Sequence, residues 1–370
     1  MSVDGIRVVI AGGGTGGHFF SGMAVGEAFK AREPGIRIIY VGTERGIEAR
    51  VGPREGLDVR FIKVSGIKGK GWLARLRALA ILPVAVLQSM ALIRREKPNF
   101  VIGVGGYASG PVVLAARLMG KQTGIVEQNS VAGLTNRILG RIAHRVFVAF
   151  DRARDVFPRK KVLLTGNPIR EGFVEMLTLD STGTVGIGDH FKLLVVGGSQ
   201  GARALNDAMI AALPRMDDAL RRQLHVVHQT GRGDVERVRA AYEAAGVSAE
   251  VHEFIHGMAE AYRLADIVLC RAGALTVSEL SISQRGSLLV PYPYAVDNHQ
   301  EYNAMELVRA GAGEMILQQN LTGDLLSETL GRLNGNRKAV QQMAWKAATL
   351  AKPAAATEVV DAMYRSVGMH

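Results

Sequence analysis

Residues 7–18 read RVVIAGGGTGGH, an apolar run that ends in five glycines within six residues. A short β-branched strand, a glycine turn and then a helix are typical of the first unit of a parallel, doubly wound sheet. The glycines let backbone N–H groups approach an anion, and the N-terminus of the following helix favours negative charge. The stretch therefore predicts an α/β fold, with an anion-binding loop between a strand at 7–11 and a helix reaching about Ala31.

The same pattern returns half a chain later. Residues 191–202 read FKLLVVGGSQGA, a second strand and glycine turn before a helix that is expected to end near Pro214. Short apolar runs predict further strands at 36–42, 100–104, 224–228, 251–254, 267–270 and 287–291. A chain of 370 residues is long enough for two domains, and Gly166-Asn167-Pro168 punctuates the pattern between them.

We therefore predict two Rossmann-like domains, residues 1–167 and 168–344, whose parallel sheets face a central cleft. A C-terminal helix at about 345–370 can pack back on the first domain. The hydrophobic fraction of 48% suits folded cores rather than disorder. The single cysteine, Cys270, excludes an intrachain disulfide and is expected in a buried strand. No signal peptide is expected, because the apolar run begins almost at once.

The basic charge is localised. The net charge is +11, and residues 60–100 hold nine Lys or Arg and one Glu, a net of +8. A local excess of cations among apolar residues predicts an anionic membrane surface as a partner. Nucleic acid is not expected, because aromatic residues make up only 6% of the chain and no RNA-binding or zinc-finger motif is recognisable.

Within this basic region, residues 78–93 form an uncharged run of 16 residues that includes Pro83. A spanning helix needs about 20 apolar residues, so the run is not expected to cross a membrane. Beyond Pro83 it can equally be a buried helix. The preceding part interleaves apolar residues with Lys and Arg, which suits the headgroup boundary of an anionic bilayer. The apolar residues of this predicted patch are Ile67, Trp72, Leu73, Leu76 and Leu79.

Three further features carry candidate chemistry. Residues 271–279, RAGALTVSE, follow a predicted strand. Glu279 can either bind a ribose diol or interact favourably with the helix dipole near the N-terminus. His299 and Gln300 follow a proline-rich loop and mark either a helix start or a site. His18, directly after the first glycine loop, is either a structural histidine or a general base with a pKa near neutrality.

Other classes of protein account for some of these features. The first loop alone also fits an NAD-dependent dehydrogenase, with Glu44 as its acidic residue, but two such loops suit two phosphorylated substrates better. A catalytically inactive membrane scaffold would leave three ligand-type loops unused. A bound metal is not expected, because His225 and His228 lie three apart on a strand and point to opposite faces. His252 and His256 lack a third ligand nearby.

An ordered set of motifs resembles the MurG family of bacterial N-acetylglucosaminyltransferases over residues 7–310. The set comprises residues 13–18 (GGTGGH), 105–111 (GGYASGP), 127–136 (EQN through GLTN), 166–170 (GNPIR), 197–202 (GGSQGA), 271–279 (RAGALTVSE) and 299–300 (HQ). The resemblance implies a GT-B fold and inverting transfer of GlcNAc from UDP-GlcNAc, with no metal or other cofactor. The implied acceptor is the MurNAc C4 hydroxyl of undecaprenyl-pyrophosphoryl-MurNAc-pentapeptide, so that lipid I becomes lipid II.

The same resemblance implies a role in peptidoglycan synthesis, cell wall biogenesis, cell shape and cell division, at the cytoplasmic face of the bacterial inner membrane as a peripheral protein. A UDP-GlcNAc 2-epimerase of similar fold is the alternative, and it would not need the basic, apolar region. One departure from the family is that residues 19–22 read FFSG where the family reads toward Pro-Ala. We expect Ser21 to cap the helix in place of that proline.

Residue roles also follow from the resemblance. His18 is the implied base. The implied donor-binding residues are Thr15, Gly16, Gly17, Asn129, Arg170, Ser199, Ile255, Ala274, Leu275, Thr276, Val277, Ser278, Glu279 and Gln300. Ile255 would meet the uracil through its backbone. The implied acceptor-binding residues are Gly105, Gly106, Tyr107 and Glu127.

Overall fold

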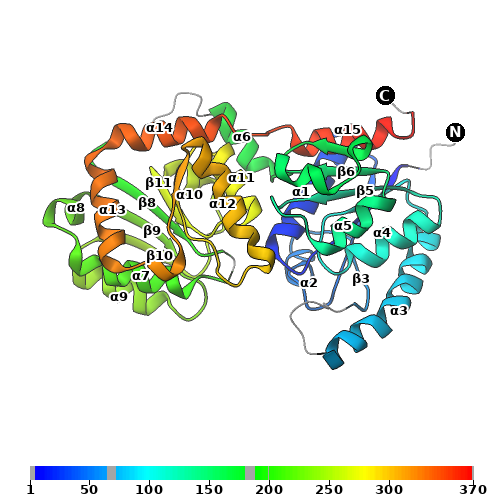
Figure 1. Cartoon of the computed structure of the whole chain (residues 1–370), viewed down its shortest axis with the longest axis horizontal. Helices are drawn as coiled ribbons and strands as arrows, with labels where there is room; N and C mark the ends of the chain where they lie inside the picture. The colour runs from blue at the N-terminus through cyan, green and yellow to red at the C-terminus, as the bar shows by residue number, and fades with distance from the viewer. Residues whose placement is uncertain (1–4, 65–71, 180–187, 199, 369–370) are drawn as a thin grey trace. The chain divides into compact units, whose positions relative to one another are not determined.

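A computed structural model of the chain describes residues 5–64, 72–179, 188–198 and 200–368. The chain forms two compact units, each a parallel sheet covered by helices (Figure 1). Unit 1 comprises Met1–Glu171 and Pro353–His370, and unit 2 comprises Gly172–Lys352. The predicted fold of two Rossmann-like parallel sheets is confirmed.

Unit 1 holds a seven-stranded sheet in the order β3-β2-β1-β4-β5-β6-β7. Its elements are β1 (Arg7–Ala11), α1 (Gly16–Arg32), β2 (Arg37–Gly42), α2 (Glu48–Val51), β3 (Val59–Phe61), α3 (Trp72–Glu96), β4 (Phe100–Gly103), α4 (Ser109–Leu118), β5 (Gln122–Glu127), α5 (Leu134–Ile142), β6 (Arg145–Val148), η1 (Asp151–Val156), η2 (Arg159–Lys161), β7 (Val162–Leu164) and α15 (Ala355–Arg365). β1 pairs in parallel with both β2 and β4, so the winding of the chain reverses between β1 and β4. Ligands bind at such a switch point, at the carboxyl ends of the strands.

The two faces of this sheet carry separate cores. Helices α3, α4 and α5 cover one face, and α1 and α15 cover the other (Figure 1). Tyr364 of α15 stacks within 6.0 Å of Phe29 and 5.2 Å of Phe100, measured between ring centroids. The C-terminal helix on unit 1 is shorter than the expected 345–370, because residues 337–348 form α14, which belongs to unit 2.

Unit 2 holds a six-stranded sheet in the order β10-β9-β8-β11-β12-β13. Its elements are α6 (Glu171–Leu179, which begins one residue before the unit), β8 (Phe191–Val196), α7 (Arg203–Ala212), η3 (Leu213–Arg215), α8 (Asp218–Gln223), β9 (Leu224–Gln229), α9 (Val235–Ala245), β10 (Ser248–His252), α10 (Met258–Leu264), β11 (Ile267–Cys270), α11 (Ala274–Ile282), β12 (Gly286–Leu289), η4 (Val296–Asn298), α12 (His299–Ala310), β13 (Gly313–Met315), η5 (Gln318–Asn320), α13 (Gly323–Gly335) and α14 (Arg337–Ala348). β8 pairs with β9 and β11, which repeats the switch point of unit 1. Cys270 is buried in β11, as predicted, and burial raises the pKa of its thiol.

Three local expectations were wrong or partly wrong. The strand expected at 251–254 is Ser248–His252, because its pairing with β9 begins at Ser248 opposite His225. Ser21 caps nothing: α1 already begins at Gly16, with Thr15 at its N-cap, and Ser21 is buried inside the helix. The buried helix considered for the residues beyond Pro83 is only partly buried. α3 runs through Pro83, and beyond it Ile93 is buried whereas Leu87 is 65% exposed. In the described part of the chain, no helix is long and apolar enough to cross a membrane.

Candidate functional site

The loops after β1 and β4 form one surface at the switch point of unit 1. A Cβ at Gly106 would lie 2.3 Å from the carbonyl oxygen of Gly13, and a Cβ at Gly12 would lie 2.6 Å from that of Gly105. Gly105 and Gly106 have φ of 87° and 77°, which side chains other than glycine rarely adopt. The first glycine loop and the predicted acceptor loop are therefore in direct backbone contact.

His18 lies on this surface, in the first turn of α1. A Cβ at Gly105 would fall 2.6 Å from the imidazole Cδ2 and 2.7 Å from Nε2, so the ring packs on the glycine backbone. Its Nδ1 lies 3.1 Å from Oγ1 of Thr15. When Nδ1–H donates to that hydroxyl, Nε2 is the basic nitrogen. The arrangement can orient a partly exposed imidazole to accept a proton.

The loop after β5 is organised by Glu127, which is 2% exposed. Its carboxylate accepts hydrogen bonds from the backbone of Asn129 (2.9 Å) and Gly133 (3.0 Å) and from the side chains of Asn129 (3.3 Å) and Asn136 (2.9 Å). Burial raises the pKa of Glu127, and these hydrogen bonds oppose the rise. Glu127 thus holds its own loop, which brings Asn129 to the same sheet edge as His18.

The remaining predicted residues of unit 1 lie around this edge. The Gln128 amide donates to the carbonyl of Val104 at 2.8 Å and so ties the β5 loop to the end of β4. Tyr107 is 53% exposed. The Arg170 guanidinium lies 4.6 Å over the ring of Phe20 in α1.

In unit 2 a single buried side chain, Gln229 at the end of β9, joins two predicted donor elements. Its amide donates to the carbonyl of Gly198 at 2.9 Å, and its oxygen accepts the N–H of Ile255 at 2.9 Å. A Cβ at Gly231 would lie 2.5 Å from the carbonyl of Gln200, so the β9 loop packs directly on the second glycine loop. The predicted Ser199 lies outside the described residues.

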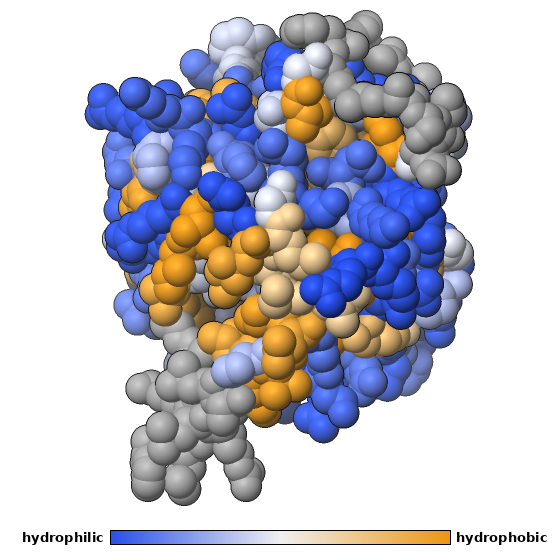
Figure 2. All heavy atoms as spheres, turned by 90° about the vertical axis from the view of Figure 1, so that its right-hand side faces the viewer, coloured by the Kyte–Doolittle hydropathy of each residue, from blue (hydrophilic) through white to orange (hydrophobic). Residues whose placement is uncertain are grey.

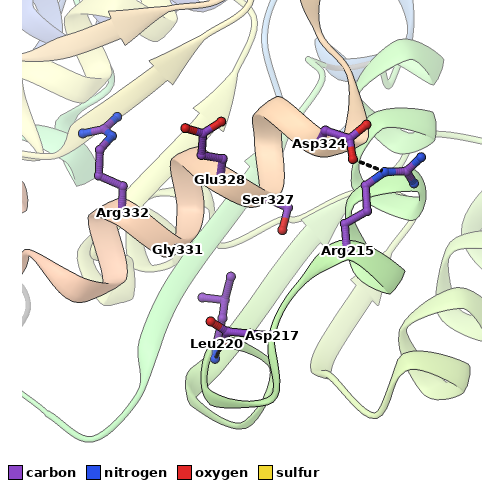
Figure 3. Close-up of a pocket in the computed structure, with 8 residues that line it drawn as sticks. All are labelled: Arg215, Asp217, Leu220, Asp324, Ser327, Glu328, Gly331 and Arg332. Carbon is purple, nitrogen blue, oxygen red and sulfur yellow. Dashed lines mark hydrogen bonds and ion pairs between the residues drawn. The ribbon is translucent and has the colours of Figure 1, made fainter.

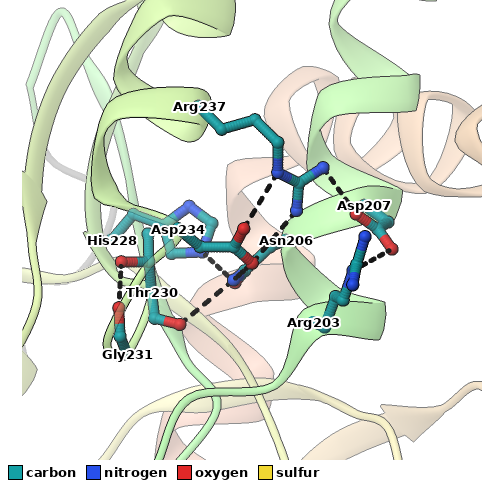
Figure 4. A network of polar contacts seen from close by, with 8 residues as sticks. All are labelled: Arg203, Asn206, Asp207, His228, Thr230, Gly231, Asp234 and Arg237. Carbon is teal, nitrogen blue, oxygen red and sulfur yellow. Dashed lines mark hydrogen bonds and ion pairs between the residues drawn. The ribbon is translucent and has the colours of Figure 1, made fainter.

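A polar network that includes the buried residues Asn206 and His228 supports the loop after β9 (Figure 4). His228 is fully buried, with Nε2 3.0 Å from Oδ1 of Asn206 and Nδ1 3.0 Å from the hydroxyl of Tyr242. Burial lowers the pKa of His228 to about 4, so the imidazole is neutral at pH 7. Asn206 also donates to the Thr230 carbonyl at 3.0 Å and to Asp234 at 2.8 Å. The network fixes the loop at 230–234 against α7.

The third predicted constellation forms a second cluster at the same sheet edge. α11 begins at Ala274, directly after Gly273, and Glu279 lies half-buried in its second turn. Arg271 donates to the Val290 carbonyl at 3.1 Å and to Oε1 of Gln318 at 2.6 Å. The oxygen of Gln300 accepts the N–H of Tyr292 at 2.9 Å. These contacts join the start of α11, the proline-rich loop and α12.

A cavity of about 480 Å³ lies in unit 2 (Figure 3). It is lined by Arg215, Asp217, Leu220, Asp324, Ser327, Glu328, Gly331 and Arg332. Helix α7 starts at the carboxyl edge of the sheet and runs back, so η3 and α8 beyond it lie at the amino edge. Arg215 and Asp324, which both line the cavity, form an ion pair at 2.6 Å. Within the described residues, no group of three or more His, Cys, Asp or Glu could hold a metal ion.

Two side chains that hold the loops of the candidate site were not predicted from the sequence. Gln229 carried one usable signal, a polar residue at the carboxyl end of an apolar strand. For Glu48 the sequence offers only the neighbouring Gly42 and Gly46, and the acidic residue named from the sequence, Glu44, is exposed. Glu48 is 1% exposed, and its Oε2 accepts the N–H of Gly14 at 2.8 Å.

Comparisons with known proteins agree with this geometry. Family models match at residues 8–148, the glycosyltransferase family 28 N-terminal domain, and at residues 192–359, the family 28 C-terminal domain. A relative from Myxococcus xanthus, named UDP-N-acetylglucosamine--N-acetylmuramyl-(pentapeptide) pyrophosphoryl-undecaprenol N-acetylglucosamine transferase, is 48% identical over 96% of this chain and 92% of its own. A relative of the same name from Trichlorobacter lovleyi is 43% identical over 98% of both chains.

Among solved structures, Acinetobacter baumannii MurG matches with a TM-score of 0.77 and 33% identity, over 98% of this chain and 100% of that one. The UDP-GlcNAc 2-epimerase from Neisseria meningitidis matches with a TM-score of 0.65 but only 13% identity, over 97% and 100% of the two chains. The second likeness concerns the fold alone.

Proposed function

The chain belongs to glycosyltransferase family 28 and within it to the MurG family. From this membership we propose which acceptor it uses, which residues form its site and which surface contacts the membrane. It has the GT-B fold and is a UDP-GlcNAc-dependent N-acetylglucosaminyltransferase of peptidoglycan synthesis. Identity of 48% over 96% of the chain carries this conclusion. The epimerase alternative is supported only by a distant likeness in fold.

For the reaction, we propose a single displacement with inversion. The C4 oxygen of the acceptor MurNAc attacks C1 of GlcNAc, the bond from C1 to the UDP oxygen breaks, and Nε2 of His18 takes the hydroxyl proton. The contact between Thr15 and Nδ1 supports this role, because the tautomer in which Nδ1–H donates to the Thr15 hydroxyl has Nε2 as its basic nitrogen. A single displacement requires no nucleophilic carboxylate.

For the acceptor, lipid I, we propose that its diphosphate binds the loop at Gly105, Gly106 and Tyr107. Gly105 and Gly106 have left-handed backbone, a conformation in which a loop can turn N–H groups toward an anion, and the N-terminus of α4 follows at Ser109. The proposed role of Glu127 is to hold the neighbouring loop through its four hydrogen bonds.

For the donor, we propose that UDP-GlcNAc binds mainly at the carboxyl edge of the unit 2 sheet. Ile255 would contact uracil, Glu279 the ribose hydroxyls and Gln300 the GlcNAc hydroxyls. The contacts of Gln229 and Gln300 support this proposal, because the first fixes the loop at Ile255 and the second joins the start of α12 to the loop at Tyr292. The roles implied for Thr15, Gly16, Gly17, Asn129, Arg170 and Ser199 remain predictions.

For location, we propose that the α3–α4 side of unit 1 docks on the anionic cytoplasmic face of the inner membrane. Val84 and Leu87 of α3 are 47% and 65% exposed, and Leu118 of α4, which packs against α3, is 67% exposed. Figure 2 shows apolar residues gathered on one side of unit 1 with hydrophilic residues around them. Ile67 and the side chains of Trp72, Leu73, Leu76 and Leu79 lie outside the described residues.

The test is release of UDP from UDP-GlcNAc with and without a lipid I analogue. We expect UDP release and a new disaccharide product only when the analogue is present. Conversion of UDP-GlcNAc to its 2-epimer without an acceptor would support the epimerase instead. Disaccharide formation with a soluble MurNAc at the same rate as with lipid I would contradict the proposed acceptor.

A further inference from the structure

Glu48 is a buried carboxylate that the proposed reaction does not use. It is the first residue of α2 and is 1% exposed. Its Oε2 accepts the N–H of Gly14 at 2.8 Å, while Oε1 accepts the N–H of Thr43 at 2.8 Å and the Thr43 hydroxyl at 3.1 Å. The carboxylate therefore links the end of β2 to the glycine loop after β1.

Three glycines leave the space that this side chain fills. A Cβ at Gly13 would lie 2.4 Å from the carboxyl carbon, a Cβ at Gly42 2.3 Å from Cγ, and a Cβ at Gly46 2.2 Å from either oxygen. Real Cβ atoms do not approach so closely, so the glycines and the carboxylate require one another. In a dinucleotide-binding loop the backbone N–H groups receive a phosphate. Here the N–H of Gly14 receives a carboxylate of the protein itself.

The other side of the same loop faces the proposed catalytic surface. Gly12 and Gly13 are in backbone contact with Gly105 and Gly106, and the ring of His18 packs on Gly105. Because the contact between Gly13 and Gly106 is made by backbone atoms, a movement of the loop at Gly13 would displace the acceptor loop as well. A continuous series of short contacts thus runs from the Glu48 carboxylate to the imidazole.

We propose that Glu48 is a positioning residue whose carboxylate takes the place of a phosphate in the first glycine loop and sets the geometry of Thr15 and His18 against the acceptor loop. The inference rests on the proposed role of His18 and its acceptor loop. Without the carboxylate, the N–H groups of Gly14 and Thr43 lose their acceptor, and the loop relaxes. Because the transfer requires close alignment, a displacement of about 1 Å can lower the rate by about 10²-fold.

The experiment compares Glu48→Ala with Glu44→Gln, a control that removes an exposed carboxylate from the same connection. We expect Glu48→Ala to lower kcat with a lipid I analogue by about 10²-fold, whereas UDP affinity measured by calorimetry stays as in the wild type. Glu44→Gln should behave as the wild type in both assays. A folded Glu48→Ala protein with normal kcat would overturn the proposal.

Chemical rescue separates positioning from general damage to the fold. Added formate should restore part of the lost kcat of Glu48→Ala, because a small carboxylate can reoccupy the space beside Gly14, whereas chloride at equal ionic strength should not. Glu48→Gln, which keeps the side-chain volume, should lose activity without rescue by formate. Lost activity in Glu48→Ala that formate leaves unchanged would also overturn the proposal. If His18→Ala keeps its turnover while the Glu48 results hold, the assignment of the base fails, and the part of the proposal that remains is that Glu48 positions the glycine loop against the acceptor loop.

Discussion

Replacing the buried His228 with glutamine tests how the donor side of unit 2 is held together. The pKa of this imidazole is about 4 in the folded protein, against 6.5 for an unperturbed histidine, because burial disfavours the charged ring. Above pH 6.5 both folded and unfolded chains are neutral at this position, so it contributes no pH dependence. As the pH falls below 6.5 the unfolded chain binds a proton first, and the folded state loses stability until about pH 4.

The magnitude follows from the two pKa values. At 1.36 kcal/mol per pKa unit, the free energy of unfolding should fall by roughly 2 kcal/mol between pH 7 and pH 5 on account of His228 alone, and by roughly 3 kcal/mol once pH 4 is passed. The variant His228→Gln carries no titrating group there. It should therefore lack this part of the acid destabilisation, although it also disturbs the hydrogen bonds to Asn206 and Tyr242 at every pH.

The assay is native-state hydrogen exchange of the β9 amides at pH 7 and pH 5, corrected for the intrinsic exchange rate at each pH. This reports the unfolding free energy of unit 2 rather than that of the whole chain. His225→Gln is the matched control, because it removes a partly exposed imidazole from the same strand. The control should keep the wild-type difference between the two pH values. Equal pH differences in wild type and His228→Gln would refute the reasoning.

Three further predictions concern the proposed roles. Glu279→Ala should weaken UDP binding by about 1–3 kcal/mol, because a charge-assisted hydrogen bond to ribose is lost, and unchanged affinity by calorimetry in a folded variant would contradict the assignment. His18→Ala should lower turnover by roughly 10²–10⁴-fold with little change in UDP-GlcNAc affinity, and near-normal turnover would place the base elsewhere. Replacing Trp72 and Leu76 together with serine should reduce sedimentation with anionic vesicles but leave UDP binding intact. Vesicle binding should weaken at salt above about 0.15 M. Equal binding to neutral and anionic vesicles would contradict the proposed role of this patch.

Much of the fold was predictable, because its signals are local. The strands at 7–11 and 191–196 are short apolar runs that end in glycine, and both became central strands flanked on two sides. The beginning of β10 was not predictable in this way. Its first residues, Ser248 and Ala249, join the sheet only because β9 lies beside them, and a polar start gives no periodic signal.

The residues of the candidate site also divide into those with a local sequence signal and those without one. Residues that form contiguous motifs, such as Thr15 and His18 or Arg271 to Glu279, could be named from the sequence alone. The side chains that hold these motifs could not. Glu48 reaches Gly14 across 34 positions, and Gln229 reaches Ile255 across 26. Such contacts depend on which strands become neighbours, and one sequence without its fold does not contain that information in a local pattern.

The two glycine loops look alike in sequence but differ in what supports them, and the difference favours unit 2 as the site of the donor diphosphate. Beneath the first loop lies the carboxylate of Glu48, a group that repels a phosphate approaching Gly14 from that side. The second loop is supported by neutral groups, the Gln229 amide and the backbone at Gly231. The N-terminus of α7, directly after it, therefore keeps its full attraction for an anion. A UDP-bound structure with the diphosphate on the second loop would agree with this argument, and one with the diphosphate beside Gly14 would contradict it.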